Sequence, residues 1–187
     1  MLVESIVILE FLNETFPTAR LLPSDPILRA NARIFISILD HKLFEGYRDF
    51  FFVSGSPATG LLAAFETLQQ RLPPIEKGKF AVGQWSIADI AAGPLLARIV
   101  MMLEHDVGKY NKGEGPKTLE VLRGPKYQRI MQYLEDVKEW PSFKATWDEV
   151  SVASTGYFGT GALGSGADGI VEADCARHLE EQPVLQA

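Results

Sequence analysis

A serine and an aspartate stand three residues apart, directly before the most apolar run of the chain. In this arrangement Ser86 and Asp89 can form a capping box, in which the hydroxyl and the carboxylate each accept a hydrogen bond from a backbone amide at a helix start. This chemistry supports folding rather than catalysis. We expect Asp89→Ala to destabilise the protein by about 1–2 kcal/mol, the usual cost of a lost cap.

The residue types that commonly act as nucleophiles or metal ligands are few. The single cysteine, Cys175, excludes an internal disulfide and a thiolate metal cluster. Glu172 and Asp174 precede it, and their negative charges disfavour the reactive thiolate, so we do not expect a nucleophile there. The three histidines are far apart, have no metal ligand at helical spacing and suggest no catalytic triad. These histidines are His41, His105 and His178.

The composition is that of an acidic globular protein. The chain has 187 residues and a formal net charge of −6, which argues against nucleic acid or an anionic membrane surface as its main partner. The first residues have no basic leader and include two glutamates, which is not typical of a secretory signal. The longest apolar stretch, residues 90–103, contains Pro94 and Arg98 and is too short to span a bilayer. We therefore expect a cytoplasmic protein.

The spacing of apolar residues predicts an all-α fold, a bundle of about five or six helices around a central helix over residues 87–103. Gly93-Pro94 predicts a bend in that helix. The segment 108–124 is rich in Gly, Lys and Pro and predicts mostly a loop, with one turn at residues 119–122. Further helices are predicted over residues 5–16, from Asp25 to about residue 51, and over residues 61–68, 126–139 and 142–150.

Several segments, taken in order, resemble the glutathione transferase family. Glu4-Ser5 with the following IVILEFLNETFP is similar to the end of the family's thioredoxin-like domain. LLPSDPILRANAR is similar to the start of the family's all-helical domain. GKFAVGQWSIADIAAGPLLAR is similar to the central helix of that domain. MMLEHDVGKY and WPSFKATWDE are similar to fungal omega-like members. The resemblance divides the chain into a thioredoxin-like remnant (residues 1–17), an all-helical C-terminal domain (18–150) and a flexible, glycine-rich acidic tail (151–187).

The resemblance also implies a function. Members of the family use glutathione as co-substrate, without a metal, and conjugate or transfer it to small hydrophobic electrophiles, as in detoxification. They act as homodimers. Their catalytic Ser, Tyr or Cys lies near the start of the thioredoxin-like domain, most of which is expected to be absent here. We therefore expect no catalytic residue in this chain, and weak or no binding of glutathione to it alone.

Binding residues can be matched to the family's positions one at a time. Glu4 and Ser5 match the acid and serine that hold the γ-glutamyl end of glutathione, and the alternative is that Ser5 simply caps the following helix. Five further residues match the positions that line the family's electrophile pocket. The alternative is that the methionine among them packs in the core and that the others are solvated or paired with a charge. Aromatic residues at Tyr47 and 50–52 could form a pocket wall, or core. The matched pocket residues are Arg33, Ser37, Asp40, Arg98 and Met102.

Two other functions stay open at this point. Helical domains of this type also serve as non-catalytic interaction modules, and an isolated helical half would expose apolar surface suited to a partner. A carrier of hydrophobic ligands is the other alternative. Ligand binding without turnover would favour the carrier.

Overall fold

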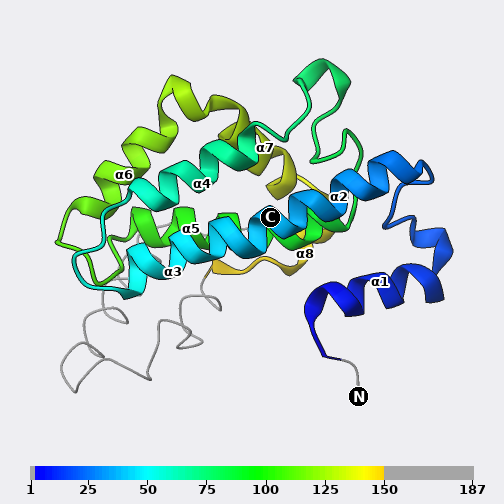
Figure 1. Ribbon diagram of the computed structural model, residues 1–187, viewed down its shortest axis with the longest axis horizontal. Coiled ribbons are helices and arrows are strands. Elements are labelled where there is room, and N and C mark those ends of the chain that lie inside the picture. Colours follow the sequence, from blue (N-terminus) through cyan, green and yellow to red (C-terminus); the bar gives the residue numbers. More distant parts are fainter. Residues whose placement is uncertain (1–2, 150–187) are drawn as a thin grey trace, which may run out of the picture. The chain divides into compact units, whose positions relative to one another are not determined.

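The computed structural model describes residues 3–149, and within this range it confirms the all-α prediction (Figure 1). Apart from one isolated bridge, residues 3–149 contain no β-structure. The chain divides into two compact units between Ala145 and Thr146, and the first of them is described below. The helices are α1 (Ser5–Thr15), α2 (Pro26–Ile38), α3 (Phe44–Phe52), α4 (Thr59–Gln69), α5 (Ile87–Glu104), α6 (Glu114–Arg123), α7 (Gln128–Lys138) and α8 (Pro141–Thr146).

Two further predictions concern the tail of the chain and the possibility of a membrane-spanning helix. The tail over residues 151–187, with Cys175 and His178, lies outside the described residues. Within the described residues, no helix has the length and apolar character that crossing a membrane requires.

Helix α5 is the centre of the core, as its apolar run predicts. Ile87, Leu96 and Leu103 are fully buried at its start, middle and end. Helices α1, α2, α6 and α7 all contact it, and Figure 1 shows it running behind α2 and α3. A helix with so many apolar residues requires neighbours on most of its sides, which the surrounding helices provide, while Pro94 stays exposed.

The long helix predicted from Asp25 is present as a continuous run of α2, a π-helical segment (Leu39–Leu43) and α3. Asp25 Oδ1 caps it by accepting a hydrogen bond from Ile27 N at 2.7 Å. Its buried face repeats every four residues: Phe35, Leu39, Leu43, Tyr47 and Phe51. Four residues of an α-helix turn about 400°, so this stripe would drift by about 40° at each step. The wider turn of the π segment, which spans one of the four steps, offsets part of that drift.

The loop predicted over residues 108–124 is wrong, because residues 114–123 form α6. Asp106 caps this helix from a distance, since its carboxylate accepts hydrogen bonds from Gly113 N at 2.6 Å and Gly115 N at 3.1 Å. Gly113 has a φ of 91°, a conformation that favours glycine. Leu119 and Leu122 are buried on the inner face of the helix. A helix whose capping residue lies seven or more positions upstream shows no local cap signature.

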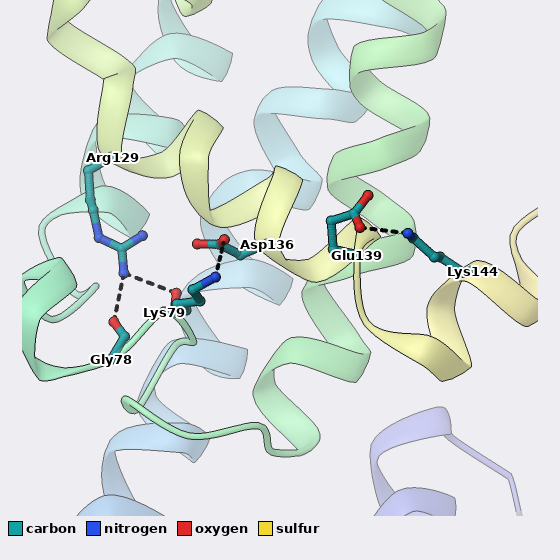
Figure 2. A network of polar contacts seen from close by, with 6 residues as sticks. All are labelled: Gly78, Lys79, Arg129, Asp136, Glu139 and Lys144. Atoms are coloured by element: carbon teal, nitrogen blue, oxygen red, sulfur yellow. Dashed lines mark hydrogen bonds and ion pairs between the residues drawn. The ribbon is translucent and has the colours of Figure 1, made fainter.

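Arg129 on α7 holds the connector that leads to α5 (Figure 2). Its Nη2 donates hydrogen bonds to the carbonyls of Lys79 at 3.1 Å and Gly78 at 3.4 Å. Lys79 Nζ in turn lies 3.4 Å from the Asp136 carboxylate, whose side chain is only 9% exposed. Two residues of α7, two turns apart, thus fix the connector before the start of α5.

Candidate functional site

The capping box at the start of α5 is formed, and it is extended by two further contacts. Ser86 Oγ accepts from Ala88 N at 3.3 Å, and Asp89 Oδ2 accepts from Ser86 N at 2.8 Å. Asp89 Oδ1 also accepts from Ala81 N at 2.8 Å and from the Tyr133 hydroxyl at 3.0 Å.

Burial is the strongest influence on the ionisation of Asp89. It raises the pKa of this carboxyl to about 6, against the opposing effect of hydrogen bonds from Ala81, Tyr133 and Ser86. Ser86 and Asp89 are both fully buried. Their partners are groups of the protein itself, so this cluster joins α5, α7 and the connector and offers no atom to a ligand.

A cavity of about 340 Å³ lies between α1 and the α2–π run. It brings together three residues predicted for the electrophile pocket, Arg33, Ser37 and Asp40, all of which are exposed to solvent. The volume lies in the range of small-molecule sites. The space is open to solvent, and three apolar side chains line it together with five polar or charged ones. The other residues that line it are Ile6, Val7, Glu10, Ile36 and His41. We call this space the α1–α2 cavity.

An ion pair joins the two helices beside this cavity. Arg33 Nε donates to Glu10 Oε1 at 2.8 Å, and both side chains are partly exposed. A pair in that environment contributes at most about 1 kcal/mol, so its main effect is to orient the guanidinium. A second contact fixes the end of α1, because Asn13 Oδ1 accepts from Leu22 N at 3.0 Å.

His41 also lines this cavity, although it is not among the residues predicted for a site. Its Nδ1 lies 2.8 Å from the backbone carbonyl oxygen of Ser37 and 3.5 Å from the Ser37 hydroxyl. A carbonyl oxygen only accepts hydrogen bonds, so Nδ1 must carry a proton. The signal that could have found it is the four-residue spacing of Ser37 and His41, which places both on one face of a helix.

The other two predicted pocket residues do not line the α1–α2 cavity. Met102 is 2% exposed, and the Tyr47 hydroxyl donates to its sulfur at 3.6 Å, so Met102 packs in the core. Arg98 lies half-exposed on α5. The aromatic cluster on α3 also belongs to the core, with the Tyr47 and Phe51 rings 5.2 Å apart.

Glu4 and Ser5 lie exposed at the start of α1. The alternative that Ser5 caps this helix is wrong, because Glu4 occupies the cap position and no side chain of the described residues makes a cap hydrogen bond there. Glu4 has a φ of 70°, a left-handed conformation that costs a residue with a side chain about 1–3 kcal/mol. The first residues of the α1–α2 cavity, Ile6 and Val7, follow directly.

A second cavity of about 390 Å³ lies between the π–α3 run and α4, and it contains none of the predicted site residues. Among residues 3–149, no group of three or more His, Cys, Asp or Glu side chains is placed to hold a metal ion.

No protein-family model matches the chain. Two curated proteins of Nicotiana tabacum, each described as a probable glutathione S-transferase, are 36% and 37% identical to it over 92 residues. These matches cover 49% of this chain and 41% of each relative. The chain thus spans less than half the length of these relatives.

Solved structures match more of the chain. Glutathione transferase Omega 2S from Trametes versicolor, in complex with 2,4-dihydroxybenzophenone, is 42% identical with a TM-score of 0.74, over 81% of this chain and 64% of that one. Glutathione transferase Omega 1C from the same organism is 35% identical with a TM-score of 0.76, over 96% of this chain and 66% of that one. The chain spans just under two thirds of each.

Proposed function

This chain belongs to the glutathione transferase family, with relatives in the fungal omega class, and we propose that it takes part in conjugation or thiol transfer of glutathione to small hydrophobic electrophiles. The observation that carries the proposal is the α1–α2 cavity, which gathers Arg33, Ser37 and Asp40 beside apolar side chains. Such a space suits a small molecule with an apolar body and a polar group. The Trametes omega 2S relative, in complex with a dihydroxybenzophenone, supports a ligand of that kind.

We propose that Glu4 and Ser5 hold the γ-glutamyl end of glutathione, the co-substrate. A carboxylate and a hydroxyl can bind an ammonium and a carboxylate, and the free amides at the start of α1 favour an anion. The left-handed backbone of Glu4 supports this role, since strained residues often serve binding sites. No metal is required by this chemistry.

We further propose that residues 1–17 are the end of a thioredoxin-like domain, that residues 18–150 are the helical domain, and that residues 151–187 are a separate tail. The exposed apolar residues of α1 outside the α1–α2 cavity support packing against further thioredoxin-like structure, because Ile8 is 37% and Phe11 46% exposed. In this proposal the thioredoxin-like part activates the glutathione thiol. The complete protein would act in the cytoplasm, as a homodimer, in detoxification.

The test is a pair of binding measurements on this chain. We expect saturable binding of the neutral dye N-phenyl-1-naphthylamine, its displacement by 1-chloro-2,4-dinitrobenzene, and weak or no calorimetric binding of glutathione. Ser37→Trp should fill the α1–α2 cavity and abolish the displacement, whereas Ser54→Trp, at an exposed position outside it, should not. Displacement unchanged in Ser37→Trp would contradict the assignment of the cavity. Saturation by glutathione at micromolar concentration would contradict the division of labour between the two domains.

The exposed face of α1 also favours a second function, a non-catalytic interaction module or a carrier of hydrophobic ligands. Val7, Ile8 and Phe11 form one exposed apolar stripe on this helix. Joining the chain to a thioredoxin-like domain of an omega enzyme distinguishes the two. Turnover of glutathione by the joined protein supports the transferase, and ligand binding without turnover supports the carrier.

A further inference from the structure

We propose that His41 selects the ligands of the α1–α2 cavity, by accepting at Nε2 a hydrogen bond from a hydroxyl group on a small, neutral, apolar molecule. This inference rests on the proposed function in one respect only, that the electrophile occupies this cavity.

The contact with Ser37 fixes the ring of His41. Because the Ser37 carbonyl accepts a hydrogen bond from Nδ1 at 2.8 Å, the neutral imidazole carries its proton on that nitrogen. The lone pair is then on Nε2, at the opposite side of the ring. A histidine whose other nitrogen is held by a carbonyl is the usual arrangement for an oriented acceptor.

The backbone around His41 places this ring at the cavity. His41 is the middle residue of the π-helical segment Leu39–Leu43, and Leu39 and Leu43 on either side of it are buried. These two anchors hold the segment to the core while His41 stays exposed and lines the α1–α2 cavity. Single π turns within α-helices occur frequently at functional sites.

The charges around the cavity exclude an anion as the favoured ligand. Its lining includes one cation, Arg33, which Glu10 engages at 2.8 Å, and a second carboxylate, Asp40. Apart from His41, the charged side chains of the lining sum to one negative charge. A neutral hydroxyl meets no such repulsion and supplies the proton that Nε2 accepts.

The apolar side chains of the lining account for the rest of the ligand. Ile6 and Val7 of α1 and Ile36 of α2 all line the cavity. A flat hydrocarbon ring would replace water against these side chains, which contributes about 25 cal/mol for each Å² of apolar surface buried. The site therefore combines non-directional binding of a ring with one directional hydrogen bond.

The test compares 2-naphthol with 2-methoxynaphthalene, in which a methyl group replaces the hydroxyl proton, each titrated into the full chain without glutathione. We expect His41→Phe, which keeps a planar ring but has no acceptor, to weaken 2-naphthol binding about tenfold and to leave 2-methoxynaphthalene binding within about twofold. His41→Gln, which retains an acceptor, should recover part of the affinity. The matched control is His105→Phe, an exposed histidine outside the cavity, which should change neither.

Equal losses for both probes in His41→Phe, no loss for either, or no saturable binding of 2-naphthol to the unaltered chain would overturn the inference. Circular dichroism of each variant checks that the fold is kept. Because these titrations contain no glutathione, they separate the two proposals. A joined protein that never turns over glutathione would refute the proposed function and leave the hydrogen bond to His41 intact.

Discussion

Asp89→Ala removes a buried carboxylate that accepts four hydrogen bonds. Loss of the cap at Ser86 costs about 1–2 kcal/mol. The structure adds two further donors, the Ala81 amide and the fully buried Tyr133 hydroxyl, which would lose their acceptor at about 1 kcal/mol each. The sum is about 3–4 kcal/mol, roughly twice what the capping motif alone predicts. For a chain of this size that corresponds to a fall in Tm of about 6–16 °C.

Urea unfolding followed by circular dichroism measures this loss, and Tyr133→Phe provides the control. Alone, Tyr133→Phe should cost about 1 kcal/mol, because it removes one donor from Asp89. In the Asp89→Ala background it should instead restore about 1 kcal/mol, since it removes a hydroxyl left without an acceptor. A loss below about 1 kcal/mol in Asp89→Ala, or further destabilisation by Tyr133→Phe in that background, would refute the reasoning.

Two further predictions concern stability. Gly46→Ala should destabilise the protein by about 1–3 kcal/mol, because the added Cβ would lie 2.9 Å from Leu61 Cα on α4 and push α3 and α4 apart. The control is Gly60→Ala, whose added Cβ meets no atom within 4 Å and which should be neutral in the same thermal melts. The raised pKa of Asp89, about 6 against 3.8, means that the native protein keeps a proton that the unfolded chain releases between about pH 4 and pH 6. The stability that Asp89 contributes is therefore fully present below about pH 4, and it falls by up to about 3 kcal/mol as the pH rises to 6. Urea titrations at several pH values should find this slope in the unaltered chain and not in Asp89→Ala.

Local signals in the sequence predicted most of the fold. The start of α5 could be recognised because Ser86 and Asp89 are three residues apart, and that of α2 because Asp25 precedes a proline. Helix α6 was missed because its cap, Asp106, reaches it across a turn. The π segment could not be predicted either, although the four-residue repeat of buried residues required some correction of this kind.

The candidate site depended on which face of a helix meets which neighbour, and spacing alone does not determine that. Arg33 and Ser37 line a cavity, whereas Met102, predicted from the same resemblance, is in the core beside Tyr47. His41 was considered only as a metal ligand or triad member, and although its spacing from Ser37 places both on one helix face, its partner is a backbone carbonyl, which every residue has. Only the folded backbone shows that this carbonyl is within reach of the ring.

The most direct test of the α1–α2 cavity as the ligand site is nuclear magnetic resonance of the ¹⁵N-labelled chain titrated with 2-naphthol. We predict that the amide shifts gather on residues 6–10 and 33–41, and that α6 is unaffected. Shifts concentrated between α3 and α4, at the second cavity, or no localised shifts at saturation, would contradict the account.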